Sequence, residues 1–159
     1  MSHKAQEELE HFDKYFKMKK GSIGDPDLYL GVKMSKVRLE NGVEAWAGSP
    51  SKYVQESVKN VDNWCRKHRG HGLKPKVQAP WPSGYHSELC ETPELDPEKA
   101  HYFQSQVGVL KGIVELGRVD IVTEVSLLSS CLALPREGHL EAMLQVFAYL
   151  KTHHNARSV

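Results

Sequence analysis

Apolar residues recur with helical spacing over residues 96–134, the most regular and apolar stretch of the chain. Asp96 as N-cap, Pro97 at the first helical position and Gly117 at the end mark the limits of a first predicted helix. At about 100° per residue, its apolar positions cover well over half of the circumference, so the core is expected to form around it. These positions are Tyr102, Phe103, Val107, Val109, Leu110, Ile113, Val114 and Leu116.

A narrow stripe without large apolar side chains remains on this helix. It consists of Gln104, Gly108, Lys111, Gly112 and Glu115. Each glycine inside a helix costs about 1 kcal/mol relative to alanine, so something should compensate for both. A neighbouring helix at short range is one explanation, and on residue chemistry alone it is favoured. A rigid ligand that approaches the main chain, such as a nucleic-acid backbone, is the other.

The N-terminal part has shorter and mixed patterns. A charged helix is expected over residues 2–12, and alternation over 15–19 predicts a short strand. Two strand-like runs, 28–39 and 43–46, are separated by an Asn-Gly pair, which is a strong hairpin signal. Gly31 interrupts the first run and suggests a bulge or another backbone passing close by.

A second group of helical patterns brackets a long irregular segment. Ser49-Pro50 starts a helix that is expected to end near Gly70. Residues 66–92 follow without regular periodicity, basic in their first half and acidic after it, and connections this long are usually functional or mobile. The inward positions of the helix are Val54, Val58, Val61 and Cys65.

Two more helices complete the expected bundle. Asp120 is predicted to cap the first, which Pro135 stops, and the second runs from about 137 to 153. The predicted fold class is therefore α+β: an N-terminal β-hairpin or small antiparallel sheet with a helix, followed by a C-terminal three-helix bundle. The expected division is 1–65, an irregular linker 66–95, and 96–159. The inward positions are Ile121, Val125, Leu128 and Leu132, then Leu140, Met143, Leu144, Phe147 and Leu150.

Composition narrows the classes of function. The 159 residues suffice for one domain, or for one domain with an appendage, and the net charge is +1, so any attraction to nucleic acid must come from local clusters of cations. Three widely spaced cysteines without a secretory leader favour a reducing, cytosolic compartment. No apolar run approaches the roughly 20 residues of a membrane span, so no membrane partner is expected.

The usual catalytic motifs are missing from the sequence. It contains no phosphate-binding Gly-rich loop, no nucleophile elbow and no His-Glu-x-x-His. Cys65, His68 and His71 could suggest zinc, but the spacing fits no standard four-ligand site, and a helix end with a basic loop is favoured. Asp25 and Asp27 flank a proline and favour a turn over a metal site. Taken alone, the chain is predicted to be non-catalytic and to carry no cofactor.

Five segments in order carry a resemblance to a known family. They are the YLGV hairpin, SPSKYVQESVKNV, the linker around ETPELD, YFQSQVGVLKGIVELGRVDIVTEVSLLSS and LPREGHLEAMLQVFAYLKTHH. Together they resemble the C-terminal half of the polymerase region of copia-type LTR-retrotransposon reverse transcriptases, over about residues 12–157. At Gly112 that family usually has an aromatic residue.

The resemblance implies a site and a partner. Its YLGV motif implies that Tyr29, Leu30, Gly31 and Val32 belong to a primer-grip hairpin that positions the primer 3′ end. Its thumb helix, which follows the minor groove of the template–primer duplex by shape and backbone contacts, implies RNA–DNA or DNA duplex as partner. The corresponding thumb positions here are Gln104, Gly108, Lys111 and Gly112. With the resemblance, nucleic-acid binding is favoured over helix packing for Gln104 and Gly108.

The resemblance also implies what lies outside this chain. The family's catalytic aspartates, which hold two Mg²⁺ ions, belong to the fingers and palm, and further acidic residues belong to a ribonuclease H domain. The chain is thus expected to be a non-catalytic fragment that works with those parts of the polyprotein, in a cytoplasmic virus-like particle or in the nucleus. Arg118, Asp120 and the segment 135–139 are expected to fix a helix corner. The alternatives are a helical protein-interaction module and a decayed element fragment without nucleic-acid binding.

Overall fold

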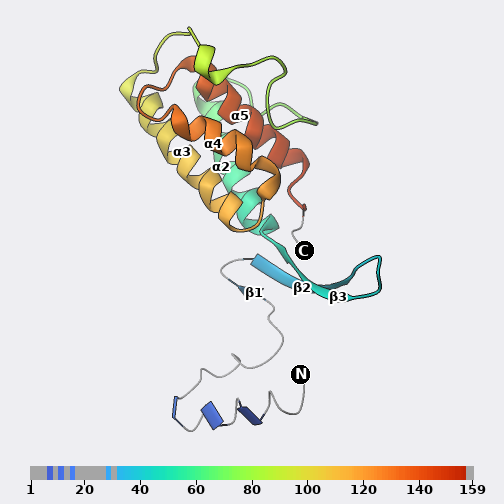
Figure 1. Ribbon diagram of the computed structural model, residues 1–159. Coiled ribbons are helices and arrows are strands. Elements are labelled where there is room, and N and C mark those ends of the chain that lie inside the picture. The colour runs from blue at the N-terminus through green and yellow to red at the C-terminus, as the bar shows by residue number, and fades with distance from the viewer. Residues whose placement is uncertain (1–6, 9–10, 13–14, 17–27, 30–31, 157–159) are drawn as a thin grey trace.

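The computed structural model describes residues 7–8, 11–12, 15–16, 28–29 and 32–156. A small antiparallel sheet precedes four helices that pack together, and the sheet projects from one end of the helical part (Figure 1). The predicted α+β class is confirmed. The elements are β1 Leu28–Tyr29, β2 Val32–Arg38, β3 Glu44–Ser49, α2 Ser51–Arg69, α3 Pro97–Glu115, α4 Val122–Ser130 and α5 Glu137–Thr152, with short 3₁₀ turns at Ser87–Leu89 and Val119–Ile121.

The Asn-Gly pair forms the predicted hairpin between β2 and β3. The two strands pair antiparallel from Lys33 opposite Ser49 to Arg38 opposite Glu44. Gly42 has φ +81°, a left-handed conformation that glycine adopts without steric cost. The side-chain oxygen of Asn41 accepts a hydrogen bond from the backbone of the residue after Gly42, at 3.1 Å. The turn is therefore fixed by local chemistry.

The expectation of one strand over residues 28–39 is wrong. The pattern divides into β1 and β2, which pair antiparallel with each other, Tyr29 opposite Val32. The chain therefore reverses direction where the apolar run suggested continuity, because apolar pattern alone cannot distinguish one long strand from two paired ones. The bulge expected at Gly31 lies outside the described residues.

The strand expected over 15–19 is not formed where the chain is described. The N–H groups of Tyr15 and Phe16 donate to the carbonyl oxygen of Phe12, at 3.0 and 2.9 Å, so these residues lie in a turn. Local bonds to the preceding helical residues replace the ladder that a strand would need. Of the helix expected over 2–12, residues 7–8 and 11–12 are described and are helical. Residues 17–19 lie outside the described part.

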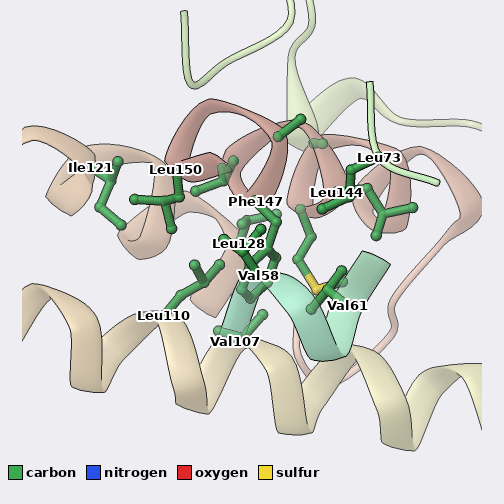
Figure 2. Packing of buried hydrophobic residues seen from close by; sticks show 14 of the residues in the cluster. Val58, Val61, Leu73, Val107, Leu110, Ile121, Leu128, Leu144, Phe147 and Leu150 are labelled. Atoms are coloured by element: carbon green, nitrogen blue, oxygen red, sulfur yellow. The ribbon is translucent and has the colours of Figure 1, made fainter. Parts of the chain in front are cut away.

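One apolar core joins all four helices (Figure 2). The inward faces predicted for α2 and α5 are buried, and α2 packs on α5 more extensively than on α3. The ring of Trp64 stacks on that of Tyr102, with centroids 4.0 Å apart, and this contact joins α2 to α3. The fully buried side chains include Val54, Val61, Phe103, Leu110, Ile113, Ile121, Leu128, Leu140, Met143, Phe147 and Leu150.

The predicted ends of α2 and α3 are confirmed. Asp96 caps α3 by accepting a hydrogen bond from the backbone of Lys99, at 2.8 Å, with Pro97 in the first turn. Gly70 ends α2 in a left-handed conformation, and Gly117 has φ +107° just beyond α3. Each of these signals acts within a few residues, which is why sequence suffices to find it.

Asp120 does not cap α4, which corrects the prediction. A 3₁₀ turn precedes α4, and its N-cap is Ile121, without a side-chain hydrogen bond. The Asp120 carboxylate instead accepts from Arg118, at 2.8 Å from Nε and 2.7 Å from Nη2, and from the hydroxyl of Tyr149 at 3.1 Å. Charge-assisted bidentate bonds to a buried guanidinium outweigh a backbone cap. The helix ends at Ser130, before Pro135.

The corner between α3 and α4 is held by this pair, as expected. Arg118 is only 1% exposed and joins Asp120, which in turn joins Tyr149 of α5. In the segment 135–139, His139 is buried and its Nε2–H donates to the carbonyl oxygen of Ser87, 3.1 Å away. The polar residues of the Arg118 corner and of the segment 135–139, which lies by the start of α3, therefore serve the fold.

The irregular connection after α2 packs on α5 rather than standing apart. The backbone N–H of Val77 donates to Thr152 Oγ1 at 3.2 Å, and Gln145 donates to the carbonyl oxygen of Ala79 at 3.3 Å. These bonds join the connection to the C-terminal half of α5. Within the described ranges, no helix combines the length and apolar content that a membrane span requires.

Candidate nucleic-acid interface

The stripe of α3 lies on the side of the helix that points away from the core. Gln104, Gly108, Lys111 and Glu115 are exposed, and Gly112 is half-buried. The large apolar positions of α3 occupy the opposite side, where Phe103, Val107, Leu110 and Ile113 are fully buried. The edge is thus exposed at Gln104, Gly108, Lys111 and Glu115 and partly covered at Gly112.

Neither glycine of this edge is required by packing within the fold. A Cβ atom placed on Gly108 would have no described atom within 4 Å apart from its chain neighbours and the backbone of its own helix. A Cβ on Gly112 would lie 3.6 Å from the hydroxyl oxygen of Tyr53, an ordinary van der Waals distance. Alanine would fit at both positions and would favour the helix by about 1 kcal/mol each. Close packing of a neighbouring helix therefore does not explain either glycine.

Gln104 has a structural bond in addition to its exposed position. Its side-chain amide donates to the carbonyl oxygen of Leu132, 3.0 Å away, in the segment after α4. This bond ties α3 to the end of α4. Gln104 therefore contributes to the fold, which the sequence did not indicate, while its side chain stays on the exposed edge.

The edge is close to neutral on α3 itself. Lys111 is its cation, and Glu115 lies one turn further along the helix. Additional positive charge comes from α2, whose first turn borders the edge where Tyr53 meets Gly112. Outward-facing cations on α2 are Lys52, Lys59, Arg66 and Lys67.

This basic face of α2 is a feature that the sequence-based predictions missed. They placed the positive charge in the first half of the irregular segment 66–92, although Lys52, Lys59 and Arg66 recur every seven residues. That spacing places side chains on nearly the same side of a helix, because 3.6 residues complete each turn. The signal was therefore present in the sequence as a helical periodicity of charge rather than of apolar residues.

The YLGV residues lie in the sheet, as far as they are described. Tyr29 belongs to β1 and Val32 begins β2, opposite each other in the antiparallel pairing. Val32 is buried, and its Cγ1 would be 3.0 Å from a Cβ on Gly48. Its side chain therefore packs against β3. Leu30 and Gly31 lie outside the described residues.

The sheet and the α3 edge meet at the same end of the helical part. β3 ends at Ser49 and α2 begins at Ser51, only a few residues before Tyr53, which lies beside Gly112. Figure 1 shows the strands projecting from the end where α3 finishes and α2 starts. The Gly112 end of the α3 edge therefore lies towards the end of the helical part from which the sheet projects.

The cysteine and histidines near the end of α2 have other contacts. Cys65 is buried in the core, the His68 ring stacks on Trp64 with centroids 4.7 Å apart, and His71 Nδ1 lies 3.1 Å from the carbonyl oxygen of Gly72. Among the residues for which coordinates are described, no three His, Cys, Asp or Glu side chains gather to hold a metal ion.

Asp62 of α2 accepts three hydrogen bonds, one of them from α5. Lys151 Nζ at 2.9 Å, Arg66 Nε at 2.7 Å and the Leu73 N–H at 2.9 Å all donate to its carboxylate. Burial raises the pKa of this carboxyl group, but the three hydrogen bonds outweigh burial and lower the pKa from 3.8 to about 2. The negative charge of Asp62 is thus balanced by Lys151 and Arg66. Its carboxylate joins α2 to α5 and to the connection at Leu73.

This carboxylate makes stability depend on pH in the acid range. A carboxyl group with a lowered pKa in the folded state stabilises the fold above pH 4 and loses that contribution as the pH falls towards 2. We expect Asp62→Asn to be less stable than wild type by about 2 kcal/mol at neutral pH, with the difference shrinking between about pH 4 and pH 2. Urea titrations at several pH values measure this, and a difference that does not change with pH would contradict it.

Comparisons of this chain with protein-family models, with curated proteins and with solved structures found no match. The resemblance to copia-type reverse transcriptases therefore rests on the order and spacing of the motifs in the sequence itself.

Proposed function

We propose that this chain binds the template–primer duplex of a copia-type reverse transcriptase, with nucleotidyl transfer performed by residues outside it. The exposed edge of α3 would follow the minor groove, where shape and sugar–phosphate contacts matter more than base identity. The small sheet at the same end would lie near the primer. Support comes from motif order in the sequence and from the open α3 edge in the fold.

The observation that carries the proposal is the open space at Gly108. A glycine in the middle of a 19-residue helix is unfavourable, and no described atom beyond the local backbone of α3 approaches where its side chain would be. A ligand whose backbone must come close to the helix would explain why this position has glycine. A nucleic-acid duplex is such a ligand, because its rigid surface extends along several helical turns.

The experiment is a titration of an RNA–DNA hybrid with the purified chain at two salt concentrations, about 50 and about 200 mM. Binding through phosphate contacts should weaken steeply as salt rises, because bound counterions are released. Lys111→Gln should weaken binding and reduce the slope of log K against log salt by about one. No detectable binding at low salt would contradict the proposal.

A matched control variant separates the effect of net charge on binding from the effect of the α3 site. Ser126→Glu lowers the net charge by one, as Lys111→Gln does, but it lies on the exposed side of α4. If both variants weakened binding equally, the effect would come from net charge alone. The proposal expects a change of slope only for the α3 variant.

A helical protein-interaction module is the second candidate, and one observation favours it. Apolar side chains are exposed on α4 and in the segments before and after it: Val119, Val122, Leu127 and Leu134. Exposed apolar groups of this kind are common at protein interfaces. Association through them would not weaken as salt rises, so the same two salt concentrations distinguish the candidates.

A further inference from the structure

A groove lies between α2 and the C-terminal end of α5. It has a volume of about 310 Å³ and is open to the surface. Its lining includes the neutralised Asp62, whose carboxylate already accepts from Lys151 and two other donors. The lining residues are Gln55, Val58, Lys59, Asp62, Lys151 and His154.

The charge of this groove is positive. Lys59 and Lys151 contribute two positive charges and Asp62 one negative charge, which leaves +1 with His154 neutral. Lys59 is exposed at the surface of α2 and His154 is half-buried after the end of α5. The groove therefore offers cationic and amide donors without an uncompensated acid.

Lys59 is also the middle member of a row along α2. Lys52, Lys59 and Arg66 are seven residues apart, so successive members are separated by about 10 Å and the row spans about 21 Å at 1.5 Å per residue. The α2 helix has only two acids, Glu56 and Asp62. Arg66 is already ion-paired with Asp62, so Lys52 and Lys59 are the members of the row that a ligand would meet first. A small anion would meet one of these two lysines, whereas an extended polyanion would meet both.

The helix dipole does not account for this row. Basic residues in the last turn of α2 complement the negative end of the dipole, and Arg66 belongs there. Lys52 stands in the first turn, at the positive end, where an acid would be favourable. That turn contains no acidic residue, and its N-cap, Pro50, provides no side-chain hydrogen bond. Lys52 therefore stands at the end of α2 where the helix dipole disfavours a cation.

We propose that the row on α2, with the α2–α5 groove beside Lys59, binds the phosphates of a nucleic-acid strand. This inference rests on the proposed function and extends the contact surface from the α3 edge across α2. The strand would follow the row, with one phosphate near Lys59 at the groove. Lys151 stays bound to Asp62, so Lys59 carries the larger share of the contact.

The test measures hybrid binding against salt for Lys59→Gln, with Lys52→Gln as an independent second variant. Each should raise the Kd and reduce the slope of log K against log salt by about one, the value expected when one phosphate is no longer neutralised by the protein. Both side chains are exposed and glutamine is a good helix former, so the melting temperature should stay unchanged. Ser126→Glu, with the same change of net charge, is the control.

The outcomes separate this inference from the proposed function. If the wild type binds and Lys111→Gln weakens binding, while both α2 variants behave like Ser126→Glu, the phosphate row is wrong and the α3 edge stands. If the α2 variants reduce the slope while Lys111→Gln does not, the contact lies on α2 and the α3 edge is wrong. If the wild type binds neither hybrid nor single strand at low salt, both fail.

Discussion

Asp120→Ala is expected to lower the free energy of unfolding by about 3–5 kcal/mol, because it would leave a buried charge without its partner. The side chain of Arg118 is 1% exposed, and two of its three guanidinium nitrogens donate to Asp120. The third, Nη1, has no partner among the described atoms. The hydrogen bonds from Arg118 also hold the pKa of the Asp120 carboxyl group below its usual value. In a chain of this size the melting temperature should fall by roughly 10 °C.

Two further variants make this prediction specific. Glu115→Ala removes an exposed acid from α3 and should leave the melting temperature nearly unchanged. Arg118→Leu combined with Asp120→Ala should recover much of the loss, since apolar residues often replace a buried ion pair without cost. An Asp120→Ala protein that melts like the wild type would contradict the role given to this pair.

The helices could be predicted from sequence because their signals are local. The cap at Asp96, the left-handed end at Gly70 and the apolar spacing of α2 and α5 each act within one or two helical turns. The Asn-Gly hairpin belongs to the same class of signal. In each case the sequence contains the whole interaction, so no knowledge of the surrounding fold was needed.

One error lies where distant residues compete for the same group. Asp120 looked like a cap, but buried Arg118 and Tyr149 of α5 take its carboxylate. The bonds of Val77 and Ala79 to α5 are likewise between distant residues, and the sequence did not indicate them. Such contacts depend on how the helices are arranged, which local patterns do not specify.

The candidate site could also be predicted only in part from the sequence. Sequence periodicity placed Gly108 and Lys111 on one stripe, and that stripe is the exposed edge of α3. On residue chemistry alone, helix packing was the favoured reason for the glycines, and only coordinates could show the open space at Gly108. The basic row on α2 could be predicted from the seven-residue spacing of its cations. Its position beside a groove could not.

Substitutions at Gly108 are expected to separate stability from binding. Gly108→Ala should raise the free energy of unfolding by up to about 1 kcal/mol, since alanine is the better helix former and its Cβ meets no described atom beyond the local backbone of α3. Gly108→Trp should be at least as stable as wild type, because tryptophan also has a higher helix propensity than glycine. Its side chain would stand where the duplex must approach. We expect it to weaken hybrid binding by roughly tenfold or more, which corresponds to about 1.4 kcal/mol.

Hybrid binding by the Gly108 series is the most direct test of the proposal that the α3 edge is kept bare for a duplex. We predict that affinity falls from glycine to alanine to tryptophan while the melting temperature does not fall. Equal affinity for all three proteins, or no binding by any of them at low salt, would contradict the proposal.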